Sequence, residues 1–118
     1  MNTKDAVQAF QYGDRAKSEL LILSQLVTIA GDLPEHELAG GKRILIACME
    51  MVRAETEFAY RATQHPDFQR VINSISEAIS LAESNQFADA GHRIGASITA
   101  ATTAAQRGWQ VLSEHGLI

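Results

Sequence analysis

The sequence predicts an all-α protein that folds as one antiparallel, up-down four-helix bundle over residues 1–118. Long segments rich in Ala, Leu, Glu, Gln and Arg, which favour helices, are separated by short breaks that contain Gly, Pro, Ser or Asn. Within these segments apolar residues recur alternately three and four positions apart, as in helices that pack in bundles. No segment shows the alternation of β-branched residues that indicates a strand.

Glycine and proline mark the ends of the first two predicted helices. The first is expected at about residues 3–30, because Gly31-Asp32-Leu33-Pro34 interrupts the apolar pattern. The second is expected at about residues 42–64, after Gly40-Gly41; residues 34–39 form either a separate turn or an early start of this helix. The first apolar stripe comprises Ala9, Gly13, Ala16, Leu20, Leu23, Val27 and Ala30, and the second comprises Leu38, Gly41, Leu45, Cys48, Val52, Glu55, Ala59 and Ala62.

The third helix is expected at about residues 67–84, because proline in His65-Pro66 favours a first helical turn and disfavours helix just before it. The fourth is expected at about residues 87–114, after Ser84-Asn85-Gln86. Their stripes are Phe68, Ile72, Ile75, Ile79 and Ala82 in the third helix, and Phe87, Gly91, Ile94, Ile98, Ala101, Ala105, Gly108 and Leu112 in the fourth.

Composition and charge argue against several classes of protein. A net charge of −4 without a basic cluster argues against a nucleic-acid binder, which needs Lys and Arg to neutralise phosphates. The longest apolar run, Ile44–Met49, is far shorter than the roughly 20 residues that span a bilayer, so we expect no membrane partner. The N-terminal residues form no apolar signal segment, and the one cysteine, Cys48, cannot form an internal disulfide. We therefore expect a cytoplasmic, reducing location.

Two helical segments carry no charged residue: Leu20–Gly31 in the first helix and Ile94–Gln106 in the last. A bundle helix with one buried stripe usually shows charged residues on its outer face every turn or so. In an antiparallel bundle these two helices are neighbours, and the end of the first lies level with the start of the last. We therefore expect one continuous region that a partner covers, since monomers rarely expose large apolar patches.

The simplest partner for this region is a second copy of the chain, related by a two-fold axis. Another helical protein would cover the same face. Gly91-x-x-x-Gly95 would allow close approach of two helices. The alternative is that the small residues of the last helix form an ordinary solvent-facing surface. The expected interface residues are Ile22, Leu26 and Ile29 from the first helix and Gly95, Thr99, Thr102, Gln106 and Trp109 from the last.

Glu55 is the most unusual polar residue, because it occupies a core position in the stripe of the second helix. A buried carboxylate is costly unless it is paired, and burial without a partner raises its pKa. It could therefore bind a metal ion together with Asp89 and His92, which lie one helical turn apart. The alternative is a carboxylate at the rim of the core, or one that pairs with an arginine of the last helix such as Arg93 or Arg107.

The sequence contains no phosphate-binding loop, no close pair of cysteines, and no nucleophile with a base and an orienting group nearby. We therefore expect a non-enzymatic helical interaction or regulatory module that needs no cofactor. The alternative is a bundle that binds a small ligand or metal ion at Glu55, Asp89 and His92. A third hypothesis makes His92 a phosphoacceptor.

Overall fold

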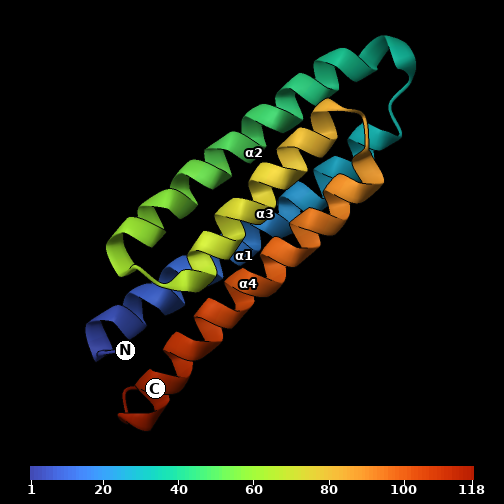
Figure 1. The fold of residues 1–118 in the computed structure, drawn as a ribbon. Helices are drawn as coiled ribbons and strands as arrows, with labels where there is room; N and C mark the ends of the chain where they lie inside the picture. The colour runs from blue at the N-terminus through green and yellow to red at the C-terminus, as the bar shows by residue number, and fades with distance from the viewer.

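The computed structural model describes residues 1–118 and consists of four α-helices with no strand. The helices are α1 (Thr3–Gly31), α2 (Glu35–Thr63), α3 (Pro66–Glu83) and α4 (Phe87–Glu114). They run alternately up and down in a rod of 55 × 21 × 17 Å, with both termini at the same end (Figure 1). The predicted all-α four-helix bundle is confirmed. None of the four helices combines the length and the apolar character needed to cross a membrane.

Capping residues begin and end several of the helices. The side chain of Asn2 accepts a 2.8 Å hydrogen bond from the backbone N–H of Asp5 and so caps α1. The imidazole Nδ1 of His65 accepts a 3.2 Å hydrogen bond from the backbone N–H of Asp67 and caps α3. Gln64 adopts the left-handed conformation with φ of 56° just after α2. This residue therefore ends α2 and lets the chain reverse into α3 within two residues.

The N-terminus of α2 extends before the glycine pair, so the early start is the correct one of the two predicted alternatives. The helix begins at Glu35, and the carbonyl oxygen of Pro34 accepts a hydrogen bond from the backbone N–H of Glu37. Neither glycine breaks the helix, and Gly41, unlike Gly40, packs closely against a neighbouring side chain. A Cβ on Gly41 would stand 2.2 Å from Cδ1 of Leu33. Tertiary packing thus offsets the low helix propensity of glycine here.

Each helix packs against two neighbours, in the order α1, α2, α3, α4 and back to α1. The predicted contact between α1 and α4 is confirmed, and glycines bring these two backbones together. A Cβ on Gly13 would stand 2.8 Å from the backbone nitrogen of Ala105, and one on Gly108 would stand 2.5 Å from the carbonyl oxygen of Ala6. A side chain at either position would therefore force the two helices apart.

The end of α1 lies level with the start of α4, as predicted, because a Cβ on Gly31 would contact Cβ of Phe87 at 3.2 Å. Within the single chain, however, the Gly91-x-x-x-Gly95 motif is not where α1 and α4 approach closely. A Cβ on Gly91 would meet only the side chain of Val27, at an ordinary 3.8 Å, and one on Gly95 would meet nothing within 4 Å. The motif does not face the α1 backbone closely enough to require glycine.

The core is formed mainly by the predicted stripes. Every residue of the α1 stripe is buried, and in the α3 stripe only Ile72 is half-buried. On α2 Leu45, Val52 and Ala59 are buried as predicted, but at two positions the buried residue is the next one along the chain. Met49 and Thr56 are buried, whereas the expected Cys48 and Glu55 are half-buried. The displacement removes Glu55 from the core and turns it toward α1.

Candidate functional site

Exposed apolar side chains gather on the side of the bundle formed by α1 and α2. Ile44, Met51 and Phe58 of α2 recur every seven residues, and their exposed fractions are 69%, 62% and 63%. Seven residues are close to two helical turns, so the three side chains form one line along α2. Ala47 and Ala54, which lie between them, are exposed too. This line therefore contains no charged residue from Ile44 to Phe58.

α1 contributes Ile22 and Ile29, which are also more than half exposed. Arg15 lies seven residues before Ile22, on the same edge of α1, and its guanidinium group bonds Glu55 of α2. The two isoleucines therefore lie on the edge of α1 that borders α2. We call the set of Ile22, Ile29, Ile44, Met51 and Phe58 the α1/α2 face.

This placement separates the α1 residues of the expected interface from those of α4. Ile22, Leu26 and Ile29 border α2, and Leu26 is half-buried against the core. On the other side of α1, Ser24 and Thr28 border the cleft shared with α4. The two uncharged segments do not form one continuous apolar face. The reason is that α1 buries its main stripe between two neighbours, and the adjacent stripe can border only one of them.

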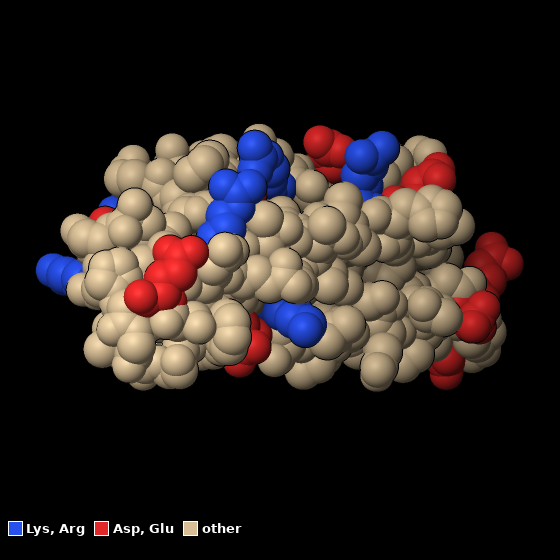
Figure 2. Space-filling view, turned by 90° about the horizontal axis from the view of Figure 1, so that it is seen from below, with Lys and Arg blue, Asp and Glu red and all other residues tan.

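The α4 part of the expected interface is small and mostly polar. Gly95, Thr99, Gln106 and Trp109 are exposed, and Thr102 is half-buried. α4 lies along the lower side of the bundle in Figure 1, and Figure 2 shows that side as mostly uncharged surface between separate groups of charged side chains. Among the five residues only Trp109 is a large exposed hydrophobic residue. This surface therefore offers less apolar area than the α1/α2 face.

A cleft of about 240 Å³ between α1 and α2 contains a cluster of charged side chains. Nη2 of Arg15 lies 2.7 Å from Oε1 of Glu55, and Nε of Arg15 lies 3.8 Å from Oε1 of Glu19. Desolvation, with a hydrogen bond and charge repulsion from Glu55, raises the pKa of Glu19 to about 7, although Arg15 lowers it. The Glu19 carboxyl group therefore carries a proton below about pH 7. Tyr12 and Phe58 also line the cleft.

The structure does not bring Glu55 together with Asp89 and His92. Glu55 lines a cleft with Arg15, whereas His92 lines a different cleft with Val27. Arg15 and Val27 are twelve residues apart in α1, which is about 18 Å along a helix. Asp89 and His92 are exposed near the start of α4. No group of three or more His, Cys, Asp and Glu side chains in the chain is placed to hold a metal ion.

Glu55 is ion-paired, as in the alternative hypothesis, but its partner belongs to α1 and not to α4. The two arginines of α4 have other partners. Nε of Arg93 lies 3.3 Å from Oε2 of Glu77, and Nε of Arg107 lies 3.5 Å from Oδ2 of Asp67. Both partners belong to α3, so these arginines bridge α4 to the helix diagonally opposite α1.

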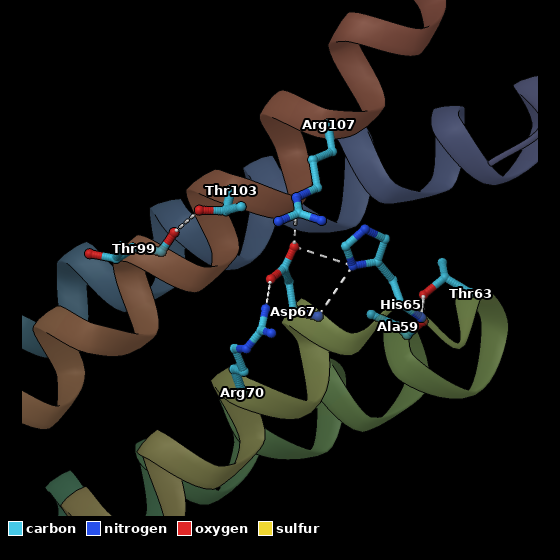
Figure 3. A network of polar contacts seen from close by, with 8 residues as sticks. All are labelled: Ala59, Thr63, His65, Asp67, Arg70, Thr99, Thr103 and Arg107. Carbon is cyan, nitrogen blue, oxygen red and sulfur yellow. Dashed lines mark hydrogen bonds and ion pairs between the residues drawn. The ribbon is translucent and has the colours of Figure 1, made fainter.

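Asp67, in the first turn of α3, is the most buried charged group, with an exposed fraction of 1%. Arg70 of α3 bonds its Oδ1, and Arg107 of α4 lies beside its Oδ2. Figure 3 shows the two guanidinium groups on opposite sides of the Asp67 carboxylate. The sequence does not reveal this cluster, because an aspartate in a first turn is usually an exposed partner of the helix dipole. The only local signal is the spacing of three between Asp67 and Arg70.

His65 completes this cluster at the junction of α2 and α3. Its Nδ1 lies 3.4 Å from Oδ2 of Asp67 and accepts a hydrogen bond from the backbone N–H of the same residue. Burial lowers the pKa of His65; Asp67 raises it, and the charges of Arg107, Arg70 and the N-terminal amine lower it further. The neutral imidazole, with Nδ1 as an acceptor, is therefore the form that caps α3.

Comparisons of the chain with protein-family models, with curated proteins and with solved structures found no match. Two regions of the molecule stand out by their geometry. One is the α1/α2 face with its adjoining cleft, and the other is the cluster around Asp67 between α3 and α4.

Proposed function

We propose that the protein is a non-enzymatic interaction module that associates with a second copy of itself through the α1/α2 face. The observation that carries this proposal is the uncharged line from Ile44 through Met51 to Phe58, with Ile22 and Ile29 beside it. Single exposed apolar residues are common on protein surfaces and need no explanation. Five large exposed ones along the neighbouring edges of two helices are typical of a protein–protein interface.

Burial of the α1/α2 face would supply the free energy of association. All five side chains are more than half exposed in the single chain. Apolar surface removed from water contributes about 25 cal/mol per Å², so the exposed part of each side chain contributes about 1 to 2 kcal/mol. Loss of translational and rotational freedom offsets part of this sum. We therefore expect a dissociation constant on the order of micromolar.

The spacing along α2 supports a second copy as the partner. Met51 lies midway between Ile44 and Phe58, seven residues from each. A two-fold axis beside Met51 would place Ile44 of one copy next to Phe58 of the other, which makes the contact complementary to itself. Arg43 and Glu57 flank the same edge of the line, eight residues before Met51 and six after it. In the antiparallel pair each would approach the opposite charge of the other copy.

The proposal includes a cytoplasmic location. The single cysteine, Cys48, is half-buried and unpaired, which suits a reducing compartment.

A second candidate function is binding of a small cationic ligand in the cleft that Glu19 and Glu55 line, since two aromatic residues, Tyr12 and Phe58, line it as well. A primary amine bound there would favour the ionised form of Glu19 and so lower the pKa of this carboxyl group. An NMR titration of the Glu19 carboxyl carbon with and without the amine tests this candidate.

Light scattering after size-exclusion chromatography, over protein concentrations of about 5 to 200 µM, tests self-association. We expect the wild-type chain to form a dimer and Met51→Glu to remain a monomer throughout this range. A charge at the centre of an apolar contact would have to be desolvated without a partner. The far-ultraviolet circular dichroism of Met51→Glu should match the wild type, because the side chain is exposed in the single chain.

Thr102→Glu is the matched control, since it places the same charge on α4 within the uncharged segment first expected to form the interface. We expect this variant to remain a dimer. Dissociation of Thr102→Glu but not of Met51→Glu would move the interface to the α1 and α4 side. A wild-type chain that is monomeric at every concentration would overturn self-association and leave another helical protein as the partner.

A further inference from the structure

The groove between α3 and α4 is a second region with an unusual charge distribution, on the side of the bundle away from the α1/α2 face. It has a volume of about 370 Å³, which is within the range of small-molecule sites. Its polar lining residues are Asp67, Arg70, Asn73, Ser74, Thr99, Thr103 and Arg107.

The positive and negative charges of the side chains that line this groove do not cancel. Asp67 is the one carboxylate that lines it, and the two arginines on either side of this carboxylate leave an excess positive charge (Figure 3). The arrangement at the other side of the bundle is the reverse, since Arg15 there lies between Glu19 and Glu55. The protein carries a net charge of −4, so the local excess at Asp67 runs against the overall balance.

The groove presents hydrogen-bond donors that the protein itself does not use. The side chains of Arg70 and Arg107 are both more than half exposed. A guanidinium group has five N–H donors, and the contacts with Asp67 use only some of them. The Oδ1 atom of Asn73 accepts a hydrogen bond from Gln69, and the amide N–H groups of Asn73 make none within the chain.

The threonine hydroxyl groups of α4 that line the groove already donate hydrogen bonds within their own helix. The arginines therefore remain the main donors for a ligand in the groove. Thr99 and Thr103 donate to carbonyl oxygens of their own helix, the latter to Thr99 at 2.9 Å (Figure 3). Their oxygen atoms line the groove without adding negative charge. The Asp67 carboxylate is buried between the two guanidinium groups, and their two positive charges exceed its single negative charge, so the cluster as a whole attracts an anion.

We propose that this groove binds a phosphate-type oxyanion through the exposed N–H groups of Arg70 and Arg107 that do not contact Asp67. The oxyanion accepts hydrogen bonds from both guanidinium groups, and Asn73 and Ser74 supply further donors at its edge. Asp67 is a positioning residue: it holds the two side chains, from α3 and α4, at one place before the anion arrives. This preorganisation reduces the side-chain entropy that binding would otherwise cost. The proposal is independent of self-association through the α1/α2 face.

Inorganic phosphate is the first probe, titrated into the full chain at about pH 8 and constant ionic strength with chloride as the balancing ion. At this pH phosphate is a dianion and His65 is neutral. The readout is the Nε–Hε cross-peak of each arginine in a ¹H–¹⁵N NMR spectrum. We expect saturable shifts at Arg70 and Arg107 and none at Arg93.

Two substitutions test the arginines individually. Arg70→Gln and Arg107→Gln should each weaken phosphate binding by about tenfold or more, because each removes one charged pair of donors. Arg93→Gln is the matched control: this exposed arginine of α4 has a single carboxylate partner, Glu77. We expect its phosphate affinity to stay within about twofold of the wild type.

Three results would overturn the proposal. They are the absence of saturable shifts at Arg70 and Arg107 up to about 50 mM phosphate, equal shifts when chloride alone is added, and equal loss of binding in Arg93→Gln and Arg107→Gln. A second titration with phenyl phosphate separates the two sources of the oxyanion. Tighter binding than phosphate identifies an organic phosphate as the ligand class, and weaker binding identifies the free ion.

Discussion

Gly108 of α4 packs directly on the backbone of α1, because a Cβ at this position would stand 2.5 Å from the carbonyl oxygen of Ala6. The same Cβ would stand 2.8 Å from the backbone nitrogen of Phe10. Both of these atoms belong to a helix backbone, which cannot move aside as a flexible side chain can. The separation of α1 and α4 near the termini therefore depends on glycine at this position.

Gly108→Ala should lower the free energy of unfolding by about 2 to 3 kcal/mol, as expected of overpacking against backbone. Urea denaturation followed by circular dichroism measures the change. Gly95→Ala is the matched control on the same helix, since a Cβ there meets nothing within 4 Å. It should raise stability by up to about 1 kcal/mol through helix propensity. Equal effects of the two substitutions would show that α4 does not approach α1 as described.

Glu19→Gln should stabilise the protein above neutral pH and have little effect in acid. The pKa of Glu19 is raised from 4.5 to about 7, so the native state binds more protons than the unfolded state between these values. The wild type therefore loses stability as pH rises from about 4.5 to about 7, and the variant avoids this loss. Because the side chain is partly exposed, solvent screening reduces the expected difference at pH 8 to about 1 kcal/mol.

The cause of this shift can be tested at Glu55. An NMR titration of the Glu19 carboxyl carbon in Glu55→Gln should give a lower pKa than in the wild type, since Glu55 raises the pKa of Glu19 through a hydrogen bond and charge repulsion. A wild-type midpoint near 4.5 would contradict the arrangement of this cleft. Stability curves of the wild type and Glu19→Gln that stay parallel from pH 4 to 8 would do so as well.

His65→Asn should make the protein less sensitive to acid. The pKa of His65 is lowered in the native state, mainly by burial and further by Arg107, Arg70 and the N-terminal amine, against the opposing effect of Asp67. The wild type therefore loses stability as pH falls below about 6.5, where the unfolded chain binds a proton more readily. Asparagine retains a side-chain acceptor for the cap of α3 and does not titrate. The measurement is the midpoint of urea denaturation at pH 7.5 and pH 5, and a larger drop in the variant would contradict the expectation.

Asp67→Asn should lower the free energy of unfolding by about 2 kcal/mol at neutral pH. The amide keeps the shape of the side chain but places N–H donors against two guanidinium groups, which removes the charge pairing of a buried carboxylate. Glu77→Gln is the matched control, because its pair with Arg93 is exposed. It should change stability by no more than about 0.5 kcal/mol. Similar losses from both substitutions would show that burial of Asp67 contributes nothing.

Much of the fold follows from local patterns. The apolar stripe of α1 and the breaks near Pro34 and Pro66 determine where helices lie and which face of α1 is buried. Short links then determine that consecutive helices are antiparallel neighbours. The buried face is harder to predict where two neighbouring stripes of one helix could each face the core. On α2 the choice between Glu55 and Thr56 for the core depends on the rotation of the helix, which its neighbours set.

The four helices and their order therefore follow from residues close along the chain, and the short links between them make α1 and α4 neighbours in an up-down bundle. Only the packing of the helices shows which neighbour a second stripe borders: Ile22 and Ile29 lie beside α2. It also decided the partner of Glu55 and the burial of Asp67 between Arg70 and Arg107. The helical repeat relates side chains only within one helix. The rotation of each helix against the next depends on packing between distant residues, so ion pairs between helices follow from that rotation.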